Sequence, residues 1–484
     1  MLEYLAYPYS VLVLIDVALL FWRPVWGLAL LVAIFPMDPW SPRLPMPGMN
    51  TETILIGVAF AVTVLRFGAR LPPLRYSGPV LAFVAVMGIA FIVSIPWANG
   101  LRAVDGSPAV WFIFKHVKSM TFTALLFFAV YWWLREPEDR QRILVALCFA
   151  LLLSSIAGII DFAFHINPRV VDGRERANGL IADANGMAES IGPLMFVPLY
   201  LLIRSREIGR ATRILAAASY GFALVAMVLS LSRGNWLAFF AAHGVFLLLV
   251  NRRLLLASVA TAAILVPLGL PLMPGIVRER IEWTTTAGST VYQVPLAVNL
   301  EGSAAARVVF ARIGLDMFLD SPVWGHGLNS FSFRTPEFGA KYGVLGHKDP
   351  HNLVVMMASE AGMIGLAMLA WLIFAISRCG RVLWRSDSKD YLLGAVLLAA
   401  ATHDLIANLS STALLHVPQI SAQFWVMYAL VARASAERFA EQEAPEAVPV
   451  QAGRWRRFAD RTRIAVPQTA SARIYAQPES GARP

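Results

Sequence analysis

Long apolar runs separated by short arginine-rich segments constrain the fold of this chain more than any other feature. A run of about 20 apolar residues is long enough to cross a bilayer as a helix. Such runs occupy 9–22, 24–37, 52–66, 79–97, 111–133, 142–164, 186–203, 213–232, 234–251, 254–273, 352–377, 390–410 and 417–434. Only 15% of the 484 residues are charged, against about 25% in soluble domains. The sequence therefore predicts an all-α, polytopic membrane protein with about 12–13 transmembrane helices, since the first two runs are short.

The segments between the spans predict one orientation. Five of them are rich in arginine: "RFGARLPPLR", "LREPEDRQR", "RSREIGRATR", "NRR" and "SRCGRVLWR". In the proposed order all five fall on one side, which should be the cytoplasm because basic residues collect in cytoplasmic loops. The net charge of +10 is thereby accounted for, and no segment interleaves aromatic and basic residues as a nucleic-acid groove does. No nucleic-acid partner is expected.

This topology divides the chain into three parts. A polytopic membrane domain spans 1–435, and a large external loop, 274–350, lies within it. The loop carries seven basic and seven acidic residues, so it is not a polybasic lipid-binding segment. The tail 436–484 is rich in Ala, Glu, Gln, Pro and Arg and is predicted to be disordered in the cytoplasm. Cys148 and Cys379 lie in or beside apolar segments, so no disulfide framework is expected.

The external loop contains one predicted helix, "SAAARVVFARIGLDMFLDSP". Ser303 can cap its start and Pro322 ends it. One face of this helix, at i, i+3, i+4 and i+7 spacing, carries Arg307, Phe310, Ala311 and Gly314. The following "VWGHGLNSF" predicts a turn at Gly325 and Gly327.

The next span begins at "GHKDPHNLVVMMASEAGMIGL", with Asp349 as the predicted N-cap and Pro350 at the first helical position. His351 would then occupy the second helical position at the external membrane surface. The positive end of the helix dipole disfavours the imidazolium there, so His351 should stay neutral and able to accept a proton. A single histidine fits equally well an interfacial residue that hydrogen-bonds a loop.

Two arginines form a pair of candidate anion-binding residues. Arg233 lies in "SLSRGNWLAFF" at the external mouth of a tight helical hairpin, and Arg307 lies in the loop helix. Both stand beside small residues that leave room for a bulky anion, and a guanidinium is a planar fork that matches phosphate oxygens. Either arginine alone fits a side chain that reaches out to lipid headgroups. Together with a neutral histidine on the same side, they favour a site.

Further candidates are more ambiguous. Arg174 and Arg176, in "GRERANGLIADANGMAESIG", fit a ligand contact or a solvated basic loop. Ionisable residues inside predicted spans are functional candidates by default; they are Asp16, Asp161, His243, Glu360 and Asp404. Glu360 is a candidate partner for an arginine of the site. External loops contain neither an Asp-x-Asp pair nor His/Cys ligand spacing, and there is no phosphate-cradling loop, so we expect no metal and no cofactor.

Three motifs, taken in order, resemble the O-antigen ligase-related family of bacterial membrane glycosyltransferases. They are "SLSRGNWL", "ARVVFARIGLDMFLDSPVWGHGLNSF" and "HNLVVMMASEAGMIGL". The element "RANGLIADANGMA" also resembles the family, so the resemblance covers about 174–377, and the N-terminal half agrees only in hydropathy. Members include ligases that attach polysaccharide to lipid A-core, polymerases that extend repeat units, and protein O-oligosaccharyltransferases.

The resemblance implies a GT-C-like membrane fold of the bacterial inner membrane with its active site facing the periplasm. It implies metal-independent, inverting transfer of a glycan from an undecaprenyl diphosphate-linked donor to a glycan or lipid A-core acceptor. Arg233 and Arg307 match the arginines that hold the diphosphate, and His351 matches the base. Our candidates for further substrate contacts are Arg174, Arg176, Arg312, Asn352 and Glu360.

Two other classes of protein remain open. A transporter or flippase for the same lipid-linked glycan would need the arginines but no base, and its charges would follow a path across the membrane. A structural membrane subunit would leave the loop motifs unexplained. Because the charged candidates cluster on one face, the sequence favours the enzyme.

Overall fold

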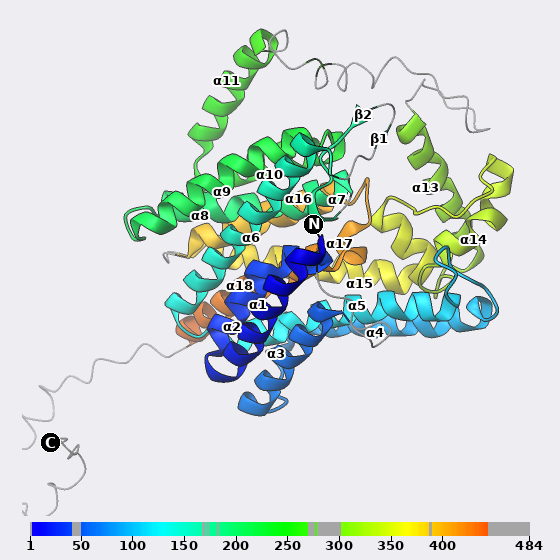
Figure 1. Ribbon diagram of the computed structural model, residues 1–484, viewed down its shortest axis with the longest axis horizontal. Helices are drawn as coiled ribbons and strands as arrows, with labels where there is room; N and C mark the ends of the chain where they lie inside the picture. The colour runs from blue at the N-terminus through cyan, green and yellow to red at the C-terminus, as the bar shows by residue number, and fades with distance from the viewer. Residues whose placement is uncertain are drawn as a thin grey trace, which may run out of the picture. The chain divides into compact units, whose positions relative to one another are not determined.

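The computed structural model describes residues 2–40, 50–166, 170–171, 174–181, 183–269, 275, 278, 302–386 and 390–443 (Figure 1). Its first elements are α1 (Leu2–Trp22), α2 (Pro24–Ile34), η1 (Phe35–Trp40), α3 (Thr51–Phe67), α4 (Leu74–Ala98), α5 (Ala109–Trp133) and α6 (Pro137–Phe164). The middle elements are β1 (Val170–Val171), β2 (Arg174–Glu175), η2 (Gly179–Ile181), α7 (Ala184–Ile191), η3 (Pro193–Met195), α8 (Phe196–Ile203), α9 (Arg210–Leu229), α10 (Arg233–Val250) and α11 (Arg252–Gly269). The last elements are α13 (Gly302–Asp320), α14 (Ser330–Gly339), η5 (Ala340–Tyr342), α15 (Leu353–Trp384), α16 (Tyr391–Ala407), α17 (Ala413–His416) and α18 (Pro418–Glu443).

The regular structure of the described residues is helical apart from a short antiparallel pair, in which Val170 faces Glu175 and Val171 faces Arg174, and an isolated bridge between Arg102 and Pro108. Where they are described, the predicted spans are helical, although 186–203 is divided among α7, η3 and α8, and 270–273 lie outside the described residues. Seven helices of the described part are long and apolar enough to cross a membrane, and three shorter apolar ones accompany them. Large apolar side chains point outward, as a lipid-facing surface requires; Trp22, for example, is 78% exposed. The chain is a polytopic membrane protein, and the total of about 12–13 spans stays a prediction.

The arginine-rich helix ends gather by direct contact. Arg140 at the start of α6 and Arg204 after α8 both approach the carboxylate of Asp390 before α16, at 3.6 and 3.9 Å. Nearby along the same set of ends, the indole N–H of Trp384, which ends α15, donates to the carbonyl of Leu249 near the end of α10 (2.9 Å). These contacts join ends that the sequence assigns to one side. The opposite ends of α10 and α15 carry Arg233 and the segment that precedes Leu353.

The loop between α13 and α14 is inserted into a break in α15. Gly362 has φ 61° and ψ −151° inside this helix, so the bond from Met363 N–H to the Ser359 carbonyl is not made there. Instead, Met363 N–H donates to the Pro322 carbonyl (2.8 Å) and the Ser359 carbonyl accepts from His326 N–H (2.9 Å). The loop thus satisfies both backbone groups that the break releases, as burial within a membrane protein requires.

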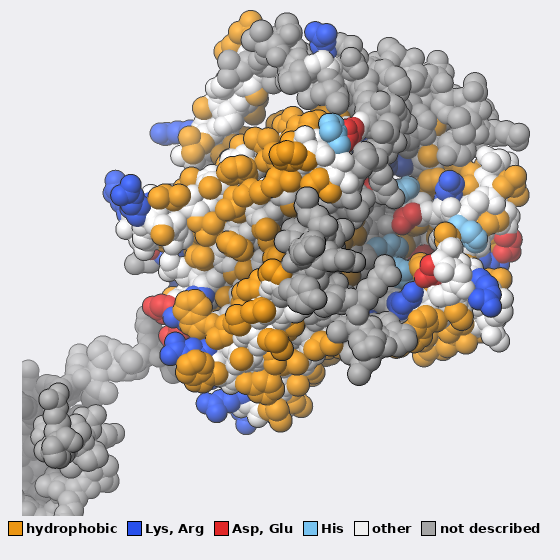
Figure 2. All heavy atoms as spheres, in the orientation of Figure 1, with side chains coloured by type: hydrophobic (Ala, Val, Ile, Leu, Met, Phe, Trp, Pro, Cys, Tyr) orange, Lys and Arg blue, Asp and Glu red, His pale blue; other side chains and the backbone are white. Residues whose placement is uncertain are grey.

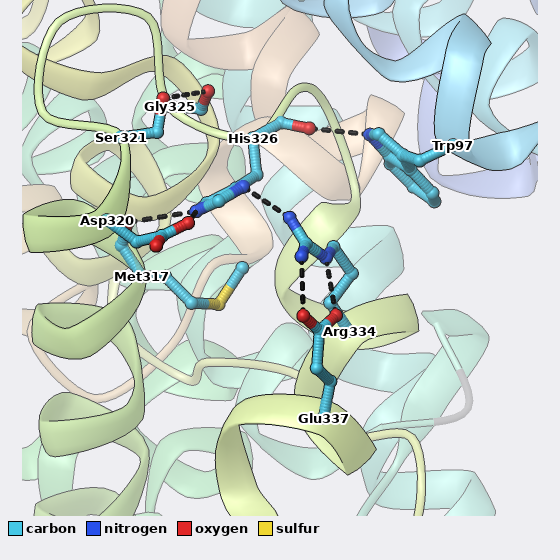
Figure 3. A network of polar contacts seen from close by, with 8 residues as sticks. All are labelled: Trp97, Met317, Asp320, Ser321, Gly325, His326, Arg334 and Glu337. Atoms are coloured by element: carbon cyan, nitrogen blue, oxygen red, sulfur yellow. Dashed lines mark hydrogen bonds and ion pairs between the residues drawn. The ribbon is translucent and has the colours of Figure 1, made fainter.

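The same loop is fixed by the side-chain network in Figure 3. Arg334 donates to Nδ1 of His326 and holds Glu337 through two bonds of 2.8 and 2.7 Å. Nε2 of His326 lies 3.0 Å from the Met317 carbonyl and 3.4 Å from a carboxylate oxygen of Asp320. Burial lowers the pKa of His326, and the charge of Arg334 lowers it further. A neutral His326 therefore accepts from Arg334 and donates to α13.

Alanine at Gly362 is expected to destabilise the protein. The φ/ψ region of Gly362 is almost restricted to glycine and costs other residues about 1–3 kcal/mol; an added Cβ would also lie 2.5 Å from the Val323 carbonyl oxygen. We expect a lower melting temperature in detergent, followed by fluorescence-detected size exclusion. Gly221→Ala is the matched control, because a Cβ there meets nothing within 4 Å. Equal melting temperatures for the two variants would contradict this account of the break.

Two predicted boundaries shift. α18 continues to Glu443, so 436–443, the first residues of the predicted disordered tail, are helical; 444–484 lie outside the described residues. The predicted helix in the external loop is confirmed as α13, although it begins at Gly302 and Ser303 lies inside it. The helix ends at Asp320, two residues before Pro322, as the sequence predicts. Of the loop before 302, only 275 and 278 are described.

Candidate functional site

Arg233 is the first residue of α10, after a three-residue turn that follows α9. Leu231 in this turn has a left-handed backbone, with φ 51°, which reverses the chain between the two helices. The predicted hairpin with Arg233 at its mouth is therefore confirmed. Arg233 is half-buried, and its neighbours Leu231 and Ser232 are buried.

The segment before α7 anchors this turn. The Arg176 guanidinium, buried to 8% exposure, donates to the Ser230 carbonyl (2.8 Å) and to Oδ1 of Asn185 (2.9 Å). The Ser232 hydroxyl donates to the same Asn185 oxygen (2.8 Å). Arg176 therefore uses these donors to hold the chain that presents Arg233, and its contact with a substrate stays a prediction.

The short loop between α16 and α17 joins the Arg233 turn to the start of α15. A Cβ on Gly234 would lie 2.4 Å from the Ser410 hydroxyl oxygen and 3.4 Å from the Ser410 Cβ, so the start of α10 lies directly against this loop. On the other side, the Leu409 carbonyl accepts from the Asn352 side-chain amide (2.9 Å). Residues adjacent to Arg233 and to His351 thus contact consecutive residues of one loop.

The predicted start of α15 is wrong by three residues. Asn352, not Asp349, is the N-cap: its side-chain oxygen accepts from Val354 N–H (2.9 Å) and Val355 N–H (3.1 Å). His351 therefore precedes the helix instead of occupying its second position, and its backbone is left-handed, with φ 48°. Asn352 uses its oxygen as this cap and its amide on Leu409; its role in substrate binding stays a prediction.

The pKa of His351 is nevertheless lowered, as predicted, for a different reason. Partial removal from water is the largest cause; the charge of Arg307 adds to it, and the charge of Asp349 opposes it. His351 itself is solvent-exposed, so a neutral imidazole is accessible at this surface.

α13 brings Arg307 to the same place. Phe310, one turn after Arg307, is buried at 3% exposure, and its ring lies 6.1 Å from that of His351. Arg307 is half-buried and close enough to affect the pKa of His351. The predicted face is only partly correct, because Ala311 is exposed; the packed face continues through the buried cluster of Val309, Ile313 and Met317. Arg312 is exposed.

The remaining candidates have different surroundings. Glu360 is buried, and its carboxylate accepts from the backbone N–H of Asn329 (2.9 Å), where the sequence suggested an arginine partner. Arg174 lies in β2, and its side chain is outside the described residues. Asp161 caps the chain before η2 by accepting from Asn178 and Gly179 N–H (2.8 and 3.0 Å). It is therefore a packing residue.

Two of the other ionisable residues in the predicted spans, His243 and Asp404, have polar neighbours. His243 lies 3.1 Å from the Tyr220 hydroxyl, and Asp404 lies 3.8 Å from His403. Asp16 is fully buried. Cys148 and Cys379 are free and buried. No group of three or more His, Cys, Asp or Glu in the described part of the chain could hold a metal ion; metal independence of the reaction stays a prediction.

Charged side chains appear at two edges of the space-filling view. Hydrophobic side chains cover much of the visible helical face; basic and acidic side chains lie at the edge opposite α13 and α14, and histidine with further charged side chains gathers on the side where α13 and α14 lie (Figures 1 and 2). Arg307 and His351 belong to this side through the contact of Phe310 with the His351 ring. Sequence reasoning identified these residues but missed the ones that position them, such as Asn185 and Ser410.

A comparison with protein families finds one similarity, in the segment that contains these residues. Residues 218–370 match the family model described as O-antigen ligase. Residues 218–370 are similar to an O-antigen ligase domain. The match confirms the resemblance from 218 onward, and it leaves "RANGLIADANGMA" outside. No curated protein matches the chain significantly. The O-antigen ligase domain implies a glycosyltransferase-type membrane enzyme that acts on lipid-linked glycans.

Proposed function

We propose that this protein transfers a glycan from undecaprenyl diphosphate to an acceptor hydroxyl on lipid A-core or another glycan. The observation that carries the proposal is the position of three residues within the matched segment 218–370. Arg233, Arg307 and His351 all fall inside it, and the contacts described above bring their neighbourhoods together. A second member of the same family, a polysaccharide polymerase, is the alternative.

The proposed division of labour follows from the chemistry of the donor. A polyprenyl diphosphate leaves readily if its charge is neutralised, so the enzyme needs cations at that place. Arg233 and Arg307 supply them. His351 accepts the proton of the acceptor hydroxyl, whose oxygen attacks the anomeric carbon on the face opposite the diphosphate. The bond from that carbon to the diphosphate oxygen breaks, which inverts the anomeric centre. The proton remains on His351 until it is released to water.

The chemistry is proposed to take place at the periplasmic face of the bacterial inner membrane. The arginine-rich helix ends would lie in the cytoplasm, with Arg233, the segment 274–350 and His351 on the other side. The tail 436–484 would be cytoplasmic. This arrangement gives the arginines access to a donor whose glycan has already crossed the membrane.

A phosphatase reporter tests this orientation. We expect phosphatase activity from a reporter fused within 280–345 and none from one fused after 436, because the reporter phosphatase folds only in the periplasm. The measurement is phosphatase activity normalised to the amount of fusion protein. An active C-terminal fusion with a silent loop fusion would reverse the orientation and remove the proposed site from the periplasm.

The glycans of a deletion strain decide among the activities. Accumulated lipid-linked polymer with bare lipid A-core indicates a ligase, and single capped repeats indicate a polymerase. A bare acceptor glycoprotein indicates protein glycosylation. A lipid-linked glycan that accumulates on the cytoplasmic face would instead support a transporter or flippase. Transfer by the purified protein, from an undecaprenyl diphosphate-linked glycan to a defined acceptor, is the direct test of the enzyme.

A further inference from the structure

Asp349 makes contacts that link His351 to α17. One of its carboxylate oxygens, Oδ1, accepts from the His351 backbone N–H (2.9 Å) and from the Thr412 hydroxyl (2.9 Å). The other, Oδ2, lies 3.7 Å from Nδ1 of His416, the last residue of α17. Three partners therefore surround this one carboxylate: the neighbouring His351 and two residues of one distant segment, Thr412 and His416.

The backbone of His351 needs such support. Its φ of 48° is left-handed, a conformation that costs non-glycine residues about 1–3 kcal/mol unless the surroundings hold it. Asp349 on one side is tied to Thr412, and Asn352 on the other side is tied to Leu409 (2.9 Å). The direction in which the imidazole leaves the chain is therefore set by its two flanking side chains and the loop that receives them.

The contact between Asp349 and His416 favours the charged form of each side chain. Burial raises the pKa of Asp349, but the contact and charge of His416, with His351, outweigh it and hold the pKa well below its usual value. Burial lowers the pKa of His416, but Asp349 and then Glu360 outweigh it and raise the pKa. The ring of His116 from α5 lies 5.8 Å from that of His416. His416 thus faces two carboxyl groups and one histidine.

We propose that Asp349 and His416 are positioning residues for His351: they hold its left-handed backbone and place a compensated negative charge beside its imidazole. The proposal rests on the proposed function only in taking His351 as the base of the reaction. Asp349 touches the His351 backbone directly, and His416 acts through Asp349. The charged groups that face His351 are Asp349, Arg307, Asp183 and Lys348, so Asp349 opposes the effect of two cations.

The proposal predicts that substitutions of Asp349 and of His416 shift the pKa of His351 in opposite directions. Asp349→Asn keeps an oxygen that can accept both hydrogen bonds but removes the negative charge, so the pKa of His351 should fall. His416→Gln removes the positive charge and leaves Asp349 uncompensated, so the pKa of His351 should rise. A role limited to packing gives no reason for opposite signs, because both substitutions would only loosen the same turn.

Diethyl pyrocarbonate measures this pKa without any glycan transfer, since it modifies neutral imidazole. The full-length protein is treated across a pH series, and modification of the peptide that contains His351 is quantified by mass spectrometry. We expect Asp349→Asn to be modified at least about threefold faster than the parent at a pH below the midpoint, which corresponds to half a pKa unit. His416→Gln should be modified more slowly there. The acid limb of kcat/KM should move in the same directions, with KM for the donor little changed.

Controls separate charge from folding. Asp105→Asn removes another external carboxylate, one whose pKa is lowered to about 2 by Ser107 and Lys115, and it should leave the His351 midpoint unchanged. Thr412→Ser keeps the hydroxyl donor, whereas Thr412→Val removes it and should lower kcat more than it changes KM.

An unchanged His351 midpoint in Asp349→Asn, or shifts of the same sign in both variants, would overturn the proposed roles of Asp349 and His416. Failure of the proposed function is a separate result: His351→Ala would then transfer glycan normally while the midpoint shifts remain.

Discussion

Replacing His351 by alanine is expected to abolish glycan transfer while the protein still binds its diphosphate-linked donor. The acceptor hydroxyl is a poor nucleophile, and a positioned general base contributes about 10²- to 10⁴-fold to such a step. Donor binding should persist because Arg233 and Arg307 remain. Both quantities are measurable on purified protein in detergent, with a labelled donor for binding and a mobility shift of the glycan for transfer.

The pH dependence of the parental enzyme follows from the same residue. Removal from water, aided by Arg307, holds the pKa of His351 below its usual value of 6.5, so the imidazole is neutral at neutral pH. Activity should therefore be flat there and fall on acidification, once the pH passes below that lowered pKa and the base becomes protonated. This fall in activity at acidic pH should be absent from the residual activity of His351→Ala.

A second histidine provides the control for this prediction. His347 is exposed in the same loop, with its Nδ1 3.0 Å from the Ser332 carbonyl, and His347→Ala should keep most of the activity. Normal transfer by His351→Ala would remove His351 from the mechanism. Loss of donor binding in that variant would make His351 a ligand-holding residue and favour the transport alternative.

The membrane architecture was predictable because its signals are local. A long apolar run favours a helix through its own composition, and the described parts of the predicted spans are helical, with 186–203 divided among α7, η3 and α8. The start of α15 was not predictable in the same way. Asp349 and Asn352 are equally good N-cap residues, and the choice depends on Asp349 being held by Thr412, a residue 63 positions away. A residue that can cap a helix is recognisable from the local sequence, but the distant contact that engages Asp349 is not.

The candidate site divides along the same line. Arg233, Arg307 and His351 stand in motifs, so the sequence could identify them. The roles of Arg176 and Asn352 depend on where their donors point, and both donate to backbone carbonyls, of Ser230 and Leu409. A sequence shows which side chains can bind a ligand but not which are already bonded within the protein. The Asp349–His416 pair was missed for this reason.

The break in α15 is a third case. A glycine at 362 within an apolar helix is compatible with a continuous span, and glycine is common in transmembrane helices. The exchange of backbone partners between Ser359, Met363 and the inserted loop arises only when α13 and α14 are in place. Because Glu360 lies beside this break and accepts from Asn329 N–H, the external loop and the start of α15 are built as one unit.

Lysine at position 233 or 307 is expected to remove most of the transfer activity, although both variants should still accumulate in the membrane. Lysine keeps the charge but lacks the planar fork that binds two phosphate oxygens at once; loss of one preorganised donor costs about 10²- to 10³-fold in kcat. Transfer is measured with the same donor and acceptor and is normalised to the amount of protein, determined by immunoblot.

Arg102→Lys is the matched control. Arg102 is an exposed residue of the α4–α5 loop that donates to the Gly106 carbonyl (2.8 Å), so this variant should transfer glycan at the parental rate. If Arg233→Lys and Arg307→Lys also do so, the two guanidinium groups contact lipid headgroups instead of the donor diphosphate.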